Sequence, residues 1–311
     1  SPLAQNIPGL FTFRERLDPL HVKHASERAT SSSSQPFAAM STTYDFQYLR
    51  VEVFEAKRYA IVWICKEPVN SMNVTLWGEL DRCLHQLESD PRKVRGVIFA
   101  SGLKRAIFTA GNDLNELYSK RTNETRFRDF WTAQTHFLAH LNTTDLITVA
   151  AVKGACPAGG CITALSCDYR LMTEKGYIGL NEVLIGVPVP KLWCKSMERL
   201  IGARHADNAL MTGKMYKPQE ALAIGMVNQV VPEDKLVPTA EAVLSKWVKL
   251  PSFGVSVTKK FLKAELGKQL YEECEEEARS TWEILKSPKI VALVERYIQG
   301  LALAKQSKAK L

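Results

Sequence analysis

The stretch that decides the fold reads Ile147-Thr-Val-Ala-Ala-Val152, then Lys153-Gly-Ala-Cys-Pro-Ala-Gly-Gly160, and further on Tyr177-Ile-Gly-Leu-Asn-Glu182. A short apolar, β-rich run that ends at glycine predicts a buried strand followed by a tight turn. Pro157 is then expected in the first turn of a helix, where its missing N–H costs nothing. Gly159 and Gly160 would leave bare N–H groups at that helix N-terminus, where negative charge is stabilised. Glu182 adds one carboxylate among apolar neighbours.

The whole chain has 311 residues, a length for which we expect one main globular domain with extensions. Residues 1–43 are rich in Ser, Pro and charge and predict an extension, partly disordered or targeting. Residues 44–250 form the expected core, and residues 251–311 a C-terminal helical region. The composition, 46% hydrophobic and 24% charged, is that of an ordinary globular protein, and no apolar run is long enough to span a membrane.

The net charge is compatible with several classes of partner, and the cysteine content indicates a redox environment. Lys and Arg exceed Asp and Glu by 41 − 33 = 8, which suits a nucleic acid, an anionic small ligand, or solubility alone. The basic residues are spread out, so a dedicated nucleic-acid face is not indicated. The seven cysteines include no CxxC pair and mostly lie in apolar contexts, which favours reduced, buried thiols in an intracellular compartment.

The two ends of the chain carry competing targeting signals. The Ser31–Ser34 run and nearby basic residues are partly typical of a mitochondrial transit peptide, although acidic residues among them argue against it. The last three residues, Ala309-Lys310-Leu311, are a conservative variant of the Ser-Lys-Leu peroxisomal address. We therefore expect a peroxisome-type organelle, with the mitochondrial matrix as the alternative.

The order of elements predicts an α/β fold. Strands are expected at 48–54, 59–64, 96–100 and 147–152, with helices at 76–88 and 124–141 between them. After Pro190 the pattern predicts helices at 191–201, 203–211, 218–224, 236–249, 251–265 and 268–305, the last broken near Ser287-Pro288. Neither GxGxxG nor GxxxxGKS occurs, which argues against Rossmann and P-loop folds.

Three residues could carry chemistry. The backbone N–H groups of Gly159 and Asn112 each follow a predicted buried strand, and two such groups could hold one oxyanion. Burial of Glu182 would raise its pKa and make it a better base near neutral pH. Each also has an ordinary interpretation: Gly159 as a close-packing glycine, Asn112 as part of a turn, and Glu182 as a paired glutamate. Asp113 and Glu116 have the spacing of a capping box.

No metal site or covalent nucleophile is predicted. His136 and His140 are four residues apart on a helix, but the segment lacks the glutamate of HExxH and an evident third ligand. We therefore interpret them as ordinary helix histidines. There is no GxSxG elbow, and no cysteine has the context of a nucleophile.

Several motifs, in order, resemble the crotonase (enoyl-CoA hydratase/isomerase) superfamily. Phe108-Thr-Ala-Gly-Asn-Asp-Leu-Asn-Glu-Leu117 and Gly154-Ala-Cys-Pro-Ala-Gly-Gly-Cys161 resemble its two oxyanion-hole segments. Pro68–Ser71, Cys167–Arg170 and Ile178–Glu182 narrow the resemblance to the Δ3,Δ2-enoyl-CoA isomerases of mitochondrial type. The resemblance covers about residues 48 to 256 and leaves 1–43 unmatched.

The resemblance implies a ββα spiral core with C-terminal helices that make trimers, or hexamers built from them. It implies an acyl-CoA substrate, no separate cofactor, no metal, and phosphate groups that account for the positive charge. Asn112 and Gly159 would supply the oxyanion N–H groups, and Glu182 the catalytic carboxylate. The expected substrate-binding residues are Thr109, Ala110, Gly111, Asn112, Asp113 and Gly159.

One departure separates the activities of the superfamily. Hydratases carry a second glutamate in the helix after the Gly-Gly turn, and Ile162 holds that position here. A single carboxylate can shuttle a proton from C2 to C4 of a 3-enoyl-CoA, which is an isomerase reaction of fatty-acid β-oxidation. A hydratase, a hydrolase of the same fold, and an RNA-binding relative stay as alternatives.

Overall fold

The computed structural model describes residues 44–308, which belong to one compact unit. The predictions for the extension at 1–43 and for the terminal tripeptide lie outside the described residues. Among the described helices, none is both long and apolar enough to cross a bilayer.

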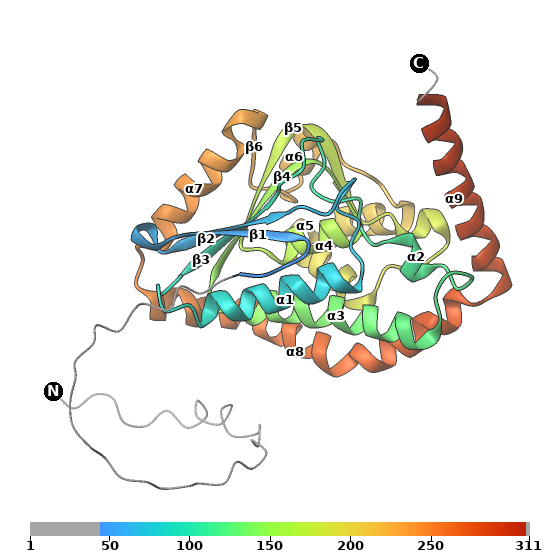
Figure 1. The fold of residues 1–311 in the computed structure, drawn as a ribbon, viewed down its shortest axis with the longest axis horizontal. Helices are drawn as coiled ribbons and strands as arrows, with labels where there is room; N and C mark the ends of the chain where they lie inside the picture. The colour runs from blue at the N-terminus through green and yellow to red at the C-terminus, as the bar shows by residue number, and fades with distance from the viewer. Residues whose placement is uncertain (1–43, 309–311) are drawn as a thin grey trace, which may run out of the picture. The chain divides into compact units, whose positions relative to one another are not determined.

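A six-stranded sheet, in the order β1-β2-β3-β4-β5-β6, forms the centre of the fold (Figure 1). Its strands are β1 Leu49–Phe54, β2 Tyr59–Ile64, β3 Gly96–Ser101, β4 Ile147–Pro157, β5 Tyr169–Gly179 and β6 Gln229–Val231. β1 and β2 form an antiparallel hairpin, and every later pair is parallel. The register between β4 and β5 shifts at Val152/Gly154, after which the two strands continue pairing up to Pro157 and Gly179.

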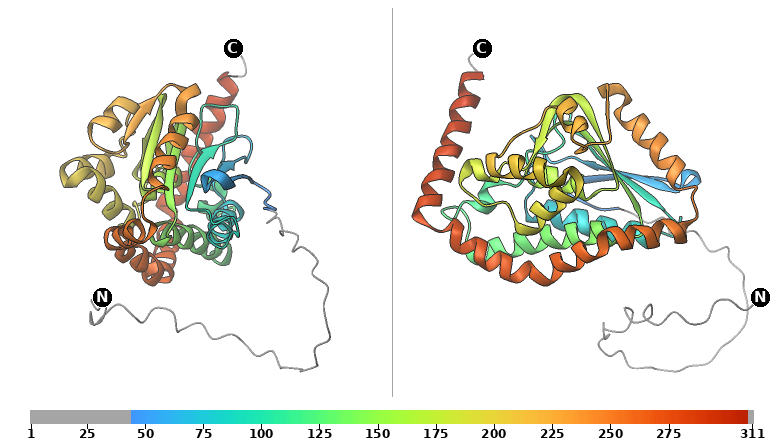
Figure 2. Two further views of the ribbon diagram at one scale, coloured as in Figure 1. Left: turned by 90° about the vertical axis from the view of Figure 1, so that its left-hand side faces the viewer. Right: turned by 180° about the vertical axis from the view of Figure 1, so that it is seen from behind.

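Helices cover both faces of this sheet. The α-helices are α1 Val74–Glu88, α2 Leu114–Leu117, α3 Glu124–Thr143, α4 Gly159–Ser166, α5 Lys191–Thr212, α6 Pro218–Ala223, α7 Leu236–Trp247, α8 Ser252–Leu285 and α9 Pro288–Lys308. Short 3₁₀ turns are η1 Glu55–Lys57, η2 Glu182–Ile185 and η3 Glu233–Lys235. α1, α3 and α8 run side by side along one side of the sheet, and α7 packs on the other (Figures 1 and 2).

The central strands are apolar throughout because both of their faces are buried. Ile61, Ile98 and Val149 are aligned across β2, β3 and β4 and pack with α7. Their chain neighbours, such as Val62 and Phe99, point to the opposite face and join the larger core with α1, α3 and α4. Because β2 to β6 run parallel, their carboxyl ends lie at one edge of the sheet, where the loops that follow them meet.

A buried ionic cluster attaches α8 to the start of β5. Asp168 lies 2.8 Å from the Nζ of Lys259 and 2.6 Å from the Nζ of Lys263, with all three side chains nearly inaccessible. Burial opposes ionisation of Asp168, but the charges of Lys263 and Lys259 outweigh it and lower its pKa to about 2. Burial lowers the pKa of Lys263 to about 8. We assign the cluster as ionic at neutral pH, since both values leave the partners charged.

Most predicted elements are confirmed, and the differences are instructive. Pro157 is the last residue of β4, so the prediction that it opens the helix is wrong. The region after Pro190 is not purely helical, because β6 extends the sheet, and β5 was not predicted before it. Gly202 interrupts α5 with a φ of 73°, as expected from the predicted break, whereas α8 runs unbroken through the predicted gap at 266–267.

Candidate active site

Two turns that lead into helices lie against each other; the second follows a loop after β3, so the strand predicted before Asn112 is wrong. The first joins β4 to α4 through Ala158, and the second leads from Phe108 to α2. A bridge between Ile107 and Ala155 holds them together. A Cβ on Gly111 would lie 3.0 Å from both the Cβ of Ala158 and the carbonyl oxygen of Pro157, so the two turns are in contact.

Both turns use unusual backbone conformations. Gly111 has a φ of 80°, which glycine adopts without steric cost. Ala158 has a φ of 50° and a ψ of −121°, a strained conformation for a residue with a Cβ. Its N–H donates to the carbonyl oxygen of Gly179 at 2.9 Å, which holds the strained residue against the end of β5. This conformation ends β4 abruptly and begins α4 with Gly159.

Asn112 and Gly159 meet across the contact between the turns. The Asn112 side chain accepts from Trp77 Nε1 at 3.2 Å and donates to Gln134 Oε1 at 2.7 Å, so it is fixed at both ends. A Cβ on Gly159 would lie 2.6 Å from Asn112 Oδ1, which leaves room only for glycine. Within residues 44–308, no hydrogen bond has the N–H of Asn112 or Gly159 as its donor. Two backbone donors are therefore available in neighbouring turns.

Glu182 begins η2, shortly after β5 ends. Both of its carboxylate oxygens are buried and have no hydrogen-bond partner among the described residues, although the residue as a whole is half-buried. Burial raises the pKa of Glu182 to about 7. A buried acid without a partner is costly for folding and is typical of a functional group.

A cavity of about 480 Å³ joins these parts. Asn112, Ala158 and Glu182 all line it, and its walls are otherwise mainly apolar. The other lining residues are Val69, Ser71, Ile107, Ala110, Asp113, Leu114, Asn115, Leu117, Arg121, Ala155, Pro157, Tyr177, Asn181, Ile185, Tyr297, Ile298 and Leu301. A larger cavity, of about 660 Å³, lies beside α3 and contains none of the three candidate groups.

Comparison with known proteins shows the family of the chain. A family model described as enoyl-CoA hydratase/isomerase matches residues 60–298. The chain belongs to the enoyl-CoA hydratase/isomerase family. Its α/β core, with C-terminal helices packed around the sheet, is the crotonase fold.

Within the enoyl-CoA hydratase/isomerase family, similar proteins include two mammalian ones. The chain is 35% identical to mouse "Enoyl-CoA delta isomerase 1, mitochondrial" over 78% of this chain and 83% of that protein. It is 32% identical to the human protein of the same name over 82% of this chain and 84% of that protein. The crystal structure of human mitochondrial delta3-delta2-enoyl-CoA isomerase superposes with a TM-score of 0.80 at 31% identity, covering 83% of this chain and all (100%) of that chain.

The predicted site residues of this family member occupy different depths. Ala110, Asn112 and Asp113 line the cavity. Thr109 is fully buried behind them, and its hydroxyl accepts from the Gly111 N–H at 2.7 Å. Gly159 is buried against Asn112 and presents backbone only. Thr109 and Gly111 thus shape the turn, whereas the residues around them face the cavity.

Only one half of the capping box predicted for Asp113 and Glu116 is present. Asp113 does cap α2, accepting from the Asn115 N–H at 3.0 Å. Glu116, however, accepts from the Val74 N–H at 3.2 Å and pairs with Arg126 at 2.7 Å. Its carboxylate therefore connects the starts of three helices, α1, α2 and α3.

The C-terminal helix contributes a wall that sequence reasoning missed. Tyr297, Ile298 and Leu301 of α9 line the same cavity as the two turns. Their spacing of one and four residues was a usable signal, since it places them on one face of a helix. The spacing does not predict which cavity that face of the helix lines.

Proposed function

We propose that this protein is a Δ3,Δ2-enoyl-CoA isomerase, which moves the double bond of 3-cis- and 3-trans-enoyl-CoA to give 2-trans-enoyl-CoA. The observation that carries the proposal is a single unpartnered carboxylate, Glu182, in one cavity with the Asn112 turn and the neighbouring Gly159 turn. The names of the mouse and human relatives support the same reaction. Coenzyme A is part of the substrate, and the proposed chemistry requires no further cofactor or metal.

In the proposed mechanism, Glu182 removes a proton from C2 of the 3-enoyl-CoA. The electron pair released at C2 delocalises as a dienolate onto the thioester oxygen, which accepts hydrogen bonds from the N–H groups of Asn112 and Gly159. The protonated Glu182 then donates the same proton to C4, and the double bond moves from C3 to C2. A base with a pKa near 7 suits this task, because it can both take and return a proton near neutral pH.

A second carboxylate free to activate water is not evident around the cavity. Asp113 and Glu182 are its acidic lining residues. Asp113 is engaged, because its Oδ1 caps α2 and its Oδ2 accepts from Ser71 at 3.2 Å. Burial opposes ionisation of Asp113, but its hydrogen bonds and Lys66 outweigh burial and lower its pKa. Ile162 is buried in the core, so its position offers no carboxylate either. These features favour isomerisation over hydration.

We further propose assembly as a homotrimer and residence in the mitochondrial matrix. Three large apolar side chains of α8 are exposed, those of Phe253, Phe261 and Leu262. Exposed apolar side chains of this kind are typical of a surface that packs against another subunit. The word "mitochondrial" in the names of the similar mammalian proteins supports a mitochondrial location. The comparisons do not support the peroxisomal alternative.

A product assay tests the proposed activity. Purified protein is incubated with 3-cis- and 3-trans-enoyl-CoA of several chain lengths, and products are separated by chromatography. We expect 2-trans-enoyl-CoA to form, with hydration of 2-trans-hexenoyl-CoA slower by orders of magnitude. Rapid hydration, or hydrolysis to free coenzyme A without isomerisation, would overturn the proposal.

The activity should depend on pH through Glu182. As the base must be deprotonated in the free enzyme, kcat/KM for 3-trans-hexenoyl-CoA should fall about tenfold per pH unit below the pKa and level off above it. With a pKa of about 7, the bend is expected near neutrality. Initial rates between about pH 5 and pH 9 check this. A bend near the ordinary glutamate value would show that Glu182 is well solvated when it acts.

Trp77→Phe should reduce activity modestly. The substitution keeps a buried ring but removes the indole N–H that donates to Asn112 Oδ1. Losing one neutral hydrogen bond corresponds to about 1 kcal/mol, or roughly a fivefold lower kcat if it loosens the Asn112 turn. KM should change little. An equal change in kcat for Trp63→Phe, whose indole N–H has no partner among the described residues, would argue against a positioning role.

A further inference from the structure

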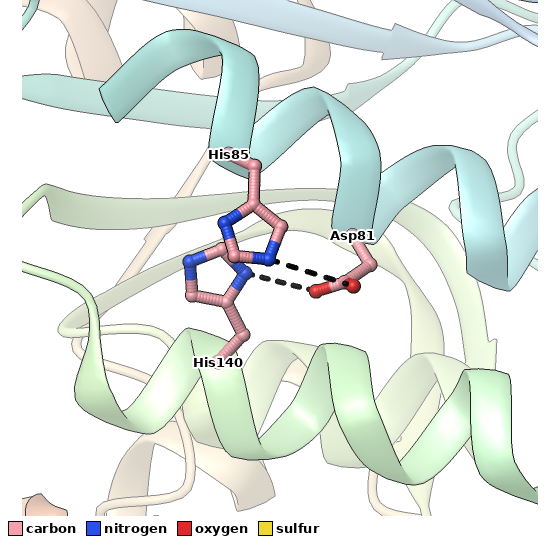
Figure 3. A group of neighbouring side chains, drawn as sticks. All are labelled: Asp81, His85 and His140. Atoms are coloured by element: carbon pink, nitrogen blue, oxygen red, sulfur yellow. Dashed lines mark hydrogen bonds and ion pairs between the residues drawn. The ribbon is translucent and has the colours of Figure 1, made fainter. Parts of the chain in front are cut away.

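The C-terminal half of α1 and the end of α3 bring together ionisable side chains that the proposed reaction does not use. Asp81 and His85 lie on one face of α1, and His140 faces them from α3 (Figure 3). Glu88, three residues after His85, lies on the same face of α1 and also approaches His140. Side chains four and three residues apart on a helix point the same way, so α1 presents its three groups to the single histidine of α3.

Both imidazoles direct a nitrogen toward the Asp81 carboxylate. His140 Nδ1 lies 2.8 Å from Asp81 Oδ1, and His85 Nε2 lies 3.8 Å from Asp81 Oδ2. The two rings are stacked, with centroids 3.9 Å apart and planes inclined by 32°. One ligand atom from each of Asp81, His85 and His140 lies within 4.8 Å of the others. Figure 3 shows the three groups converging on one small volume between the helices.

We propose that Asp81, His85 and His140 bind a divalent transition-metal ion, with zinc as the best match. Two imidazole nitrogens and one carboxylate, with water in the fourth position, form a tetrahedral set that zinc accepts. Zinc ligands about 2.0–2.1 Å from the ion lie roughly 3.3 Å from one another. Reaching that separation requires mainly a small movement of His85, whose side chain is 62% exposed.

The surroundings of His140 match those of a metal-binding imidazole. Its other nitrogen, Nε2, lies 3.2 Å from Glu88 Oε2, and Thr144 donates to the second Glu88 oxygen at 2.5 Å. A carboxylate that accepts the Nε2–H keeps that proton on Nε2, so Nδ1 can bind a metal ion once the proton it shares with Asp81 is displaced. Glu88 and His140 also line the 660 Å³ cavity beside α3, which gives an ion a path to the site.

The site differs from the pair His136 and His140, which the sequence pattern led us to interpret as ordinary helix histidines. His136 packs against Tyr271 of α8, with ring centroids 5.0 Å apart. The second histidine comes instead from α1, in a pairing that depends on the packing of two helices. The prediction of no metal site rested on His136 and His140, whereas the site proposed here uses a different set of residues.

A metal here would join α1 to α3 without taking part in catalysis. Trp77, which contacts Asn112, precedes His85 by eight residues, or about 12 Å along the helix at 1.5 Å per residue. The expected effect is therefore on stability. The proposal stands apart from the isomerase activity, and either can fail without the other.

Metal titration of the full chain, dialysed against chelator, tests the site. We expect zinc to raise the melting temperature by about 5 °C when present at about 100 times its Kd, and magnesium to leave it unchanged. Cobalt(II) should give the visible absorption bands of a tetrahedral nitrogen and oxygen site, without thiolate charge-transfer bands. Absence of micromolar zinc binding would overturn the proposal and leave the cluster as an imidazole–carboxylate hydrogen-bond network.

Variants locate the ion. His85→Gln, at an exposed position that should not disturb folding, is expected to weaken zinc binding about 100-fold, and Glu88→Gln about 10-fold. His136→Gln is the matched control and should bind zinc like the unmodified chain. Equal zinc affinity in His85→Gln and the unmodified protein would place the ion elsewhere and refute the assignment.

Discussion

Glu182→Gln is expected to lower kcat for 3-trans-hexenoyl-CoA by about 100- to 10,000-fold, the range for loss of a general acid–base group. Glutamine keeps the size of the side chain but can neither accept the C2 proton nor return it to C4. The carboxylate has no partner among the described residues, so its removal should not break a structural contact. The buried charge also disappears, and the variant should be at least as stable as the unmodified protein at neutral pH.

Steady-state kinetics and thermal unfolding of the same preparation measure both effects. Glu174→Gln serves as the control, because Glu174 is exposed on β5 and lies outside the cavity. Its kcat should equal that of the unmodified protein. Near-normal activity of Glu182→Gln would rule out the proton shuttle and leave another group as the base.

Gly159→Ala is expected to reduce kcat by about 100-fold, within the range for loss of one oxyanion donor. The added Cβ would lie 2.6 Å from Asn112 Oδ1 and 3.0 Å from the Trp77 ring. Because both neighbours are fixed, the start of α4 must move, and the Gly159 and Asn112 N–H groups can no longer meet at one oxygen. Overpacking of this kind also costs about 1–3 kcal/mol of stability.

The comparison that isolates this effect is Gly254→Ala. Gly254 lies near the start of α8, and a Cβ added there would have no heavy atom within 4 Å, so the same substitution meets nothing. Alanine in a helix should stabilise the protein by about 0.5–1 kcal/mol and leave kcat unaltered. If Gly159→Ala kept full activity while losing stability, Gly159 would be a packing glycine only.

Local signals in the sequence were enough to predict much of the fold. The apolar runs of β2, β3 and β4 and the leucine spacing of α1 report burial directly, since these residues pack wherever the element lies. β5 was missed because Arg170, Glu174 and Lys175 obscure its pattern. The burial of Arg170 depends on the carbonyl oxygens of Cys167 and Met226, and the second of these is remote in sequence.

The residues of the candidate site could be predicted from the sequence, but their arrangement in space could not. Asn112, Gly159 and Glu182 stood out from their flanking residues and from a family resemblance. The contact between Gly159 and Asn112 and the missing partners of Glu182 depend on packing between segments far apart in the chain. The approach of His85 to His140 arises in the same way, so no spacing along one helix could reveal it.

The position of α9 has a consequence for how this enzyme family can diversify. The groups assigned to chemistry belong to turns around the central sheet, whereas Tyr297, Ile298 and Leu301 belong to the last helix of the chain. Substitutions in α9 can therefore reshape the room available to an acyl chain while the reacting groups stay in register. New substrate ranges become accessible through changes near one terminus, with the inherited reaction left intact.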